Sequence, residues 1–140
     1  MKNRASLSLM EQLIMILVFA LAATLCLQGF AAANRISQKT GQVDHAIHHV
    51  QNTAELLKAY GGNIDTQLPV CALPTADGWV VYYNKNWEPE EKTDHPQYCM
   101  EIVRQNAGIK GLGQAQIKMS VMSSQSELFS LTGAWQEGTA

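Results

Sequence analysis

Apolar residues dominate the first quarter of the chain, and from residue 43 onward they follow the spacing of amphipathic elements. The 21 residues from Leu13 to Ala33 contain no charged side chain. As an α-helix they would cover about 31 Å, which is enough for the hydrocarbon core of a bilayer. The pattern therefore predicts a membrane-spanning helix close to the N-terminus.

The helix is expected to continue beyond this span, because the polar stretch 34–42 contains no proline. An apolar stripe with steps of three and four residues then follows, formed by Val43, Ile47, Val50, Ala54 and Leu57. Gly61 and Gly62 predict its end. A helix from Leu7 to Tyr60 would be about 81 Å long. The stripe on its second half needs a sheet to cover it.

Four segments of the C-terminal half have the composition or the alternation of β-strands: 78–83, 98–105, 115–122 and a last strand that places Phe129, Leu131 and Trp135 on one face. The proline-containing stretches 63–75 and 87–96 are expected to be loops. Short strands in hairpin succession predict an antiparallel meander. The expected fold class is α+β, with the second half of the helix packed on this small sheet.

Length and charge limit the function classes. Of the 140 residues, about 33 go to the N-terminal segment and its apolar helix, so we expect one small soluble domain. The formal net charge of −2 gives no reason to expect nucleic acid as a partner. The chain shows no nucleophile elbow, phosphate-binding loop or zinc-protease motif, and we expect neither an enzyme nor a cofactor.

Three cysteines divide unequally along the chain. Cys26 lies in the apolar segment, while Cys71 and Cys99 lie in the C-terminal domain. Outside the cell a Cys71–Cys99 disulfide would stabilise a small domain by ~2–4 kcal/mol. Two free, buried thiols are an equally good interpretation, because the spacing along the chain does not determine the Cα separation.

Two polar clusters raise the question of a metal site. His45 and His49 have the spacing of two ligands on one helix turn, but His49 lies about 200° around the helix from Ile47, so we expect it to face solvent. A second cluster lies in the loop 87–96, where the spacing matches no EF-hand. It is expected to be solvated surface and consists of Glu88, Glu90, Glu91, Asp94 and His95.

The stretch Ser6-Leu7-Ser8-Leu9-Met10-Glu11 resembles the prepilin cleavage and methylation motif of type IV pilins and type II secretion pseudopilins, which reads Gly-Phe-Thr-Leu-Ile-Glu. The resemblance implies cleavage between Ser6 and Leu7 and methylation of the new amine of Leu7. Glu11 would then be the fifth residue of the mature chain. Ser6 stands where the family usually has Gly and Leu7 where it has Phe, and the helix lacks the proline that many pilins carry.

The resemblance also implies a domain organisation and a set of partners. Residues 1–6 would be the leader, 7–33 the transmembrane and assembly helix, 34–62 its amphipathic continuation and 63–140 the sheet domain. The implied partners are a prepilin peptidase, other pilin or pseudopilin subunits, an inner-membrane assembly platform and membrane lipid. The chain would cross the cytoplasmic membrane once with its C-terminal domain outside, and then join an extracellular or periplasmic filament of a pilus, competence or secretion system.

A physical argument, independent of the motif, also predicts a partner for the Glu11 carboxylate. An unpaired carboxylate inside lipid costs a few kcal/mol, and a free amine on a neighbouring helix would offset that cost. Alternatively, Glu11 is a helix N-terminal acid at the level of the headgroups. Two other functions stay open: a monomeric membrane-anchored binding domain, and a protein secreted after signal cleavage near Ala33.

Overall fold

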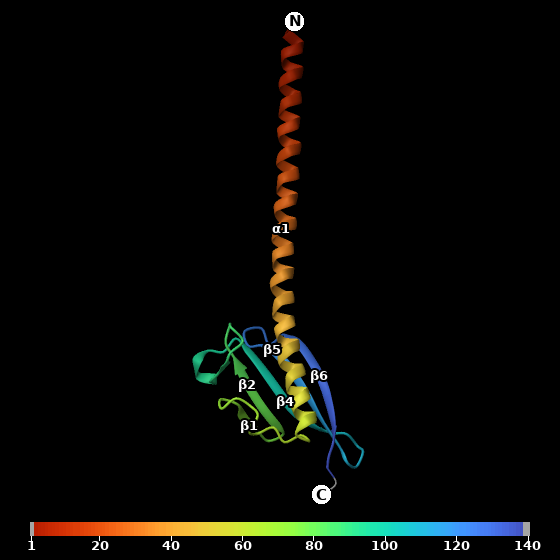
Figure 1. Ribbon diagram of the computed structural model, residues 1–140. Coiled ribbons are helices and arrows are strands. Elements are labelled where there is room, and N and C mark those ends of the chain that lie inside the picture. The colour runs from red at the N-terminus through yellow and green to blue at the C-terminus, as the bar shows by residue number, and fades with distance from the viewer. Residues whose placement is uncertain (1, 139–140) are drawn as a thin grey trace. The chain divides into compact units, whose positions relative to one another are not determined.

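The computed structural model describes residues 2–138, apart from the side chains of Lys2 and Thr93, so the domain expected at 63–140 extends beyond the described residues. Its elements are, in chain order, helix α1 (Lys2–Ala59), β1 (Leu73–Thr75), β2 (Gly78–Tyr83), β3 (Pro89–Glu90), the 3-10 helix η1 (Lys92–Asp94), β4 (Tyr98–Asn106), β5 (Leu112–Val121) and β6 (Glu127–Gln136). One long, apolar N-terminal helix and an antiparallel sheet make an α+β protein (Figure 1), as the sequence predicts.

The chain forms two compact units with the division between Thr40 and Gly41, and α1 contributes to both. The first unit is helical throughout its described residues, and its side chains from Asn3 to Thr40 are all exposed. Leu, Met and Ala are good helix formers, and neither a proline nor, before Gly29, a glycine interrupts them. The helix therefore forms although no other part of this unit covers it.

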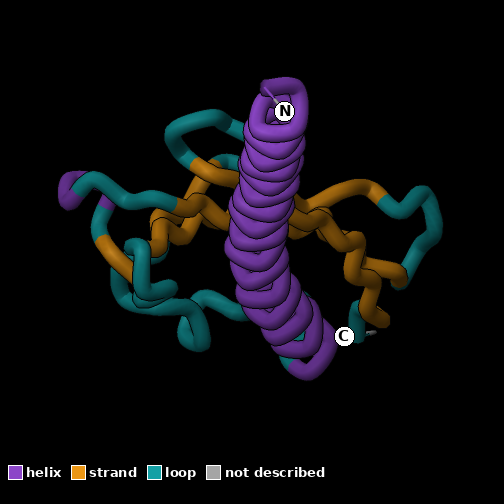
Figure 2. The backbone as a smooth tube through the Cα atoms, turned by 90° about the horizontal axis from the view of Figure 1, so that it is seen from above, coloured by secondary structure: helices purple, strands orange, loops and turns teal. Residues whose placement is uncertain are grey.

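In the second unit the last part of α1 lies across one face of the sheet (Figure 2). Its buried residues are Ala46, Val50, Thr53, Ala54 and Leu57. The predicted stripe is confirmed at three positions, whereas Val43 and Ile47 are only half-buried and Ala46 takes the place between them. Small residues bring the helix close to the sheet, since a Cβ on Gly133 would lie 3.7 Å from the Cβ of Ala54.

The helix ends at Ala59, and the two glycines predicted to stop it follow directly after Tyr60. Gly61 and Gly62 both have positive φ, 58° and 85°, which a residue with a Cβ rarely adopts. The Gly62 N–H donates to the carbonyl of Leu57 at 2.8 Å and closes the last turn. The indole of Trp135 packs against Gly62 and against Gly113, where any Cβ would overlap the ring.

The sheet is antiparallel, with strand order β1-β2-β4-β5-β6. The short strand β3 also pairs with β2, as β1 does. The four strands predicted from the sequence are all present. The expectation that 63–75 and 87–96 are loops was wrong at β1 and β3, each of which contains a proline, Pro74 and Pro89. Proline is tolerated at the edge of a sheet because an outward N–H has no partner to lose.

The core lies between α1 and rows of side chains that cross the helix-facing side of the sheet. One row is Trp79, Ile102, Ile117 and Leu131, and the next is Val81, Met100, Met119 and Phe129. Most of these side chains are buried, and Phe129 and Leu131 are partly exposed at the border. The buried Thr53 donates its hydroxyl to the carbonyl of His49 at 2.9 Å, so this polar group is satisfied within the core.

Candidate functional site: the apolar first unit

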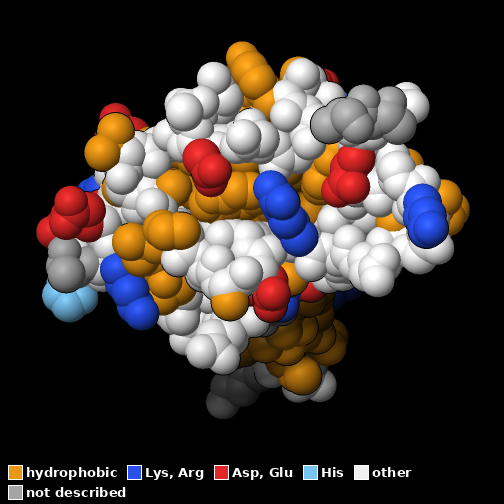
Figure 3. Space-filling model, turned by 90° about the horizontal axis from the view of Figure 1, so that it is seen from below, with side chains coloured by type: hydrophobic (Ala, Val, Ile, Leu, Met, Phe, Trp, Pro, Cys, Tyr) orange, Lys and Arg blue, Asp and Glu red, His pale blue; other side chains and the backbone are white. Residues whose placement is uncertain are grey.

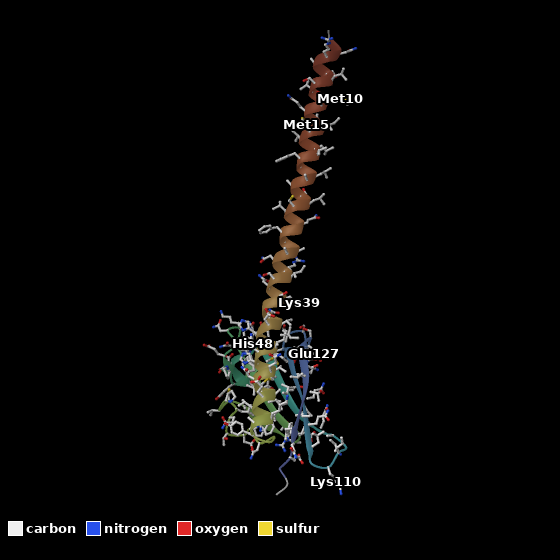
Figure 4. All side chains as sticks on the ribbon, turned by 45° about the vertical axis from the view of Figure 1, so that its right-hand side comes forward. Met10, Met15, Lys39, His48, Lys110 and Glu127 are labelled. Carbon is white, nitrogen blue, oxygen red and sulfur yellow. The ribbon has the colours of Figure 1, made fainter. Side chains whose placement is uncertain are left out.

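The most unusual surface of the chain is the apolar part of the first unit. Large apolar side chains from Leu7 to Phe30 are exposed, and Phe19 and Phe30 have relative exposures of 77% and 80%. Met10 and Met15 extend from the helix surface in the same way (Figure 4). A soluble monomer rarely exposes a contiguous apolar surface of this size, so this segment is built for apolar surroundings or for other helices.

Length and composition make α1 a candidate membrane span. Its most apolar window has a mean hydropathy of 2.4, and none of that window is buried within the chain. Thr24 fits such surroundings because its hydroxyl donates to the carbonyl of Ala20 at 2.8 Å and needs no water. The side chains of Ile14, Met15, Val18, Phe19 and Ala22 border a shallow apolar groove on the helix, a shape into which side chains of a second helix can pack.

The structure places the motif residues on one continuous stretch of helix. Ser6, Leu7 and Glu11 all belong to α1, and their side chains are exposed. The residues of the expected leader that the structure describes, 2–6, are helical as well, so a protease would have to unwind this turn to reach the Ser6–Leu7 bond. Leu7 and Glu11 are four residues apart and therefore lie on the same face of the helix. Among the side chains that the structure describes, none forms an ion pair with Glu11.

The second unit holds a cluster of stacked rings where the sequence predicted solvent. The Trp87 ring stacks on Tyr98 with a centroid distance of 3.9 Å, and on His45 and His49 at 5.4 and 5.8 Å. His49 also contacts Tyr83 at 4.7 Å. The expectation that His49 faces away from the core was therefore wrong, because the loop after β2 folds over that side of the helix.

Trp87 adopts a backbone conformation that is rare for a residue with a side chain, with φ of 64°. Asn84 holds the turn: its side-chain oxygen accepts from the N–H groups of Asn86 and Glu88, and its carbonyl accepts from the N–H of Trp87. Burial, together with the charges of His45 and His48, lowers the pKa of His49 from its ordinary value. These surroundings therefore favour the neutral form of His49.

Charged residues of the second unit are mixed on the face seen in Figure 3, where Lys and Arg alternate with Asp and Glu. The acidic loop contributes exposed carboxylates from Glu88, Glu91 and Asp94. Within the part of the chain that the structure describes, no group of three or more His, Cys, Asp or Glu side chains could hold a metal ion.

The cysteines are free thiols in the structure, so the Cys71–Cys99 bridge is not formed. Burial, and then the nearby Cys71 thiol, raise the pKa of Tyr83 to about 12, whereas burial and Cys99 raise the pKa of Tyr82. Adjacent strand residues point to opposite faces of a sheet. Cys99, which pairs with Tyr82 across β2 and β4, therefore lies on the face of the sheet opposite to Tyr83. Burial also raises the pKa of Cys99 to about 11.

Comparisons with known proteins leave the family open. No protein-family model matches the chain, and neither a curated protein nor a solved structure matches it.

Proposed function

We propose that the chain is a pilin-like or pseudopilin-like structural subunit of a type IV pilus, competence or type II secretion-like filament. The proposal rests on two features that occur together. The stretch from Ser6 to Glu11 resembles the prepilin motif, and it is followed directly by an apolar helix whose side chains are exposed. The exposed helix alone supports a membrane anchor equally well. The motif adds a cleavage site and a carboxylate at a defined distance from the new N-terminus.

In this proposal a prepilin peptidase cuts between Ser6 and Leu7 and methylates the amine of Leu7. The helix 7–33 first anchors the chain in the cytoplasmic membrane with the second unit outside. It then leaves the bilayer to pack against the same helix of neighbouring subunits. Polar pairing matters more than usual while the helices still lie in lipid, because lipid gives little hydrophobic drive for helices to associate. Glu11 pairs with the amine of a neighbouring chain through a charge-assisted contact.

Intact mass tests the processing step. The full chain, co-expressed with an active peptidase of a type IV pilus or type II secretion system, should lose its first six residues and gain one methyl group. An inactive peptidase is the control, and Ser6→Gly, which restores the usual residue, should be cut at least as efficiently. A chain that stays intact with both Ser6 and Gly would contradict the proposal, and a mature chain that begins at Asn34 would establish secretion instead.

Assembly tests the role of Glu11 separately. Glu11→Leu should remain in the membrane fraction, because it makes the segment more apolar, but it should no longer appear in filaments sheared from the cell. Gln12→Leu is the matched control, since it replaces a neighbouring polar side chain by the same residue. Equal assembly of wild type and Glu11→Leu would disprove the pairing. A wild-type chain that is processed and stays in the membrane without assembling would instead support the anchored binding domain.

A further inference from the structure

Two cations follow the apolar span of α1 and have no role in the filament proposal. Arg35 and Lys39 are the only charged residues between Glu11 and Asp44. They are four residues apart on α1, so they lie on the same face of the helix. Both side chains are exposed, and among the side chains that the structure describes none forms an ion pair with either of them. Their positive charges are therefore available to a partner outside the chain.

Distance along the helix places both cations at the far end of the span. The uncharged stretch from Leu13 to Ala33 covers about 31 Å, the thickness of the hydrocarbon core. Arg35 lies about 3 Å and Lys39 about 9 Å beyond Ala33 along the helix axis. The headgroup layer occupies about the next 5–8 Å on each side of the core. When the apolar stretch fills the core, the Cα of Arg35 lies within this layer and the Cα of Lys39 lies at its outer border.

The direction of helical side chains brings both charges toward the lipid phosphates. Every Cα–Cβ bond in an α-helix is tilted toward the N-terminus, which for these residues is the direction of the span. The long side chain of Lys39 can therefore return its amine into the headgroup layer (Figure 4 labels Lys39). Gln38, three residues after Arg35, adds an amide donor to the same face. The sequence has no carboxylate between residues 12 and 43 that would compete for these donors.

These donors match the chemistry of a phosphate group. A guanidinium forms two parallel N–H···O bonds with phosphate oxygens, and an ammonium binds them as a point charge. In the proposed topology both cations lie outside the cell membrane, whereas basic residues beside a span are usually found on the cytoplasmic side. An anionic headgroup at the same depth offsets this disadvantage. A zwitterionic headgroup does so less well, because its own ammonium competes for the phosphate.

We propose that Arg35, Gln38 and Lys39 form a binding site for the phosphate of an anionic phospholipid in the outer leaflet. Arg35 holds the phosphate through its guanidinium, and Lys39 adds its amine from above. The bound lipid then fixes the depth at which the helix lies in the bilayer. This lipid site rests on the membrane span of the proposed function and not on filament assembly, so it applies equally to an anchored binding domain.

Native mass spectrometry of the full chain, released from detergent micelles, tests the site. Phosphatidylglycerol is the probe, and phosphatidylcholine with the same acyl chains is the comparison lipid. The wild-type chain should retain phosphatidylglycerol preferentially. Arg35→Gln combined with Lys39→Gln should weaken the binding of phosphatidylglycerol by roughly tenfold or more. The basic N-terminus is the same in both chains, so the difference between them reports the site alone.

A matched double variant controls for net charge. Lys85→Gln combined with Lys110→Gln removes two exposed cations from the second unit and should leave the binding of phosphatidylglycerol unchanged. Equal retention of the two lipids by the wild-type chain, or no loss in Arg35→Gln with Lys39→Gln, would overturn the proposal. Displacement of the lipid by millimolar inorganic phosphate would also overturn it, because the site would then bind free anions.

Filament assembly separates this proposal from the previous one. If Arg35→Gln with Lys39→Gln keeps the lipid but no longer appears in sheared filaments, the two cations contact a neighbouring subunit and the lipid site is wrong. If the wild-type chain is neither processed nor assembled but still prefers phosphatidylglycerol through these residues, the filament proposal fails and the lipid site stands.

Discussion

One helix passes through two regions in which apolar residues have different partners. Up to Thr40 every side chain described is exposed, so Leu17 and Phe19 gain nothing from the rest of the chain. After Gly41 the apolar residues are restricted to one face, where Val50 and Leu57 are fully buried against the sheet. The difference shows that burial in the fold explains only the second region. The apolar character of the first region needs a cause outside this chain, either lipid or other helices.

The largest expected difference between the two regions is in the cost of removing a leucine. Leu57→Ala should lower the free energy of unfolding of the second unit by about 2–5 kcal/mol, because it leaves a cavity between α1 and the sheet. Leu17→Ala removes the same atoms from an exposed site, with 57% exposure, and should leave this free energy unchanged. Urea denaturation in detergent, followed by tryptophan fluorescence, measures both. A similar loss in the two variants would mean that the first region also folds against the rest of the chain.

Replacing a glycine by alanine should destabilise the sheet domain at one position and stabilise the helix at another. Gly113→Ala would place a Cβ inside the indole of Trp135 and should cost about 1–3 kcal/mol. Gly41→Ala meets no atom within 4 Å and should stabilise the helix by about 0.5–1 kcal/mol. Thermal unfolding midpoints compare the two. A destabilising Gly41→Ala would show that the junction between the two units needs a glycine.

The smallest expected effect is the dependence of the second unit on pH. Folding lowers the pKa of His49, chiefly through burial and then through His45 and His48, so the folded state binds this proton less tightly than the unfolded state. The contribution of His49 to the free energy of unfolding is therefore fully present above the ordinary pKa of 6.5. It is lost as the pH falls through the lowered pKa of the folded state. His49→Phe keeps a ring against Tyr83 and Trp87 and should reduce the fall in unfolding midpoint between about pH 7.5 and pH 5. His95→Asn is the control, because His95 is exposed outside the ring cluster and its positive φ of 59° is one that asparagine tolerates. An unchanged fall in both variants would assign the acid sensitivity to other groups.

Local sequence was sufficient for much of the fold. Alternation in residues 115–122, the β-branched and aromatic run 78–83 and the glycine pair after Tyr60 each describe an element by its own residues, and the structure has all three. The strands β1 and β3 were missed because each is two or three residues long and contains a proline. Such a strand exists only because β2 offers it an edge, and no pattern within it shows this.

The surroundings of the histidines were beyond the sequence for a related reason. A helical wheel places His49 relative to Ile47, but it cannot include a loop that starts after β2 and returns over the helix with Trp87. The same holds for Cys99, whose place beside Tyr82 follows from the pairing of β2 with β4. Ser6, Leu7 and Glu11 have exposed side chains, and the roles proposed for them rest on the sequence motif.

The sequence by itself determined the apolar N-terminal helix, the amphipathic stripe after it and the main strands, because these depend on composition and on periods of 3.6 and 2 within short windows. Only the tertiary structure decided which side of the helix is covered, that Trp87 stacks on the histidines, and that β6 lies at the edge of the sheet. Each of these depends on strand order and on loop paths. Both are set by contacts between residues far apart in the chain, which no local pattern records.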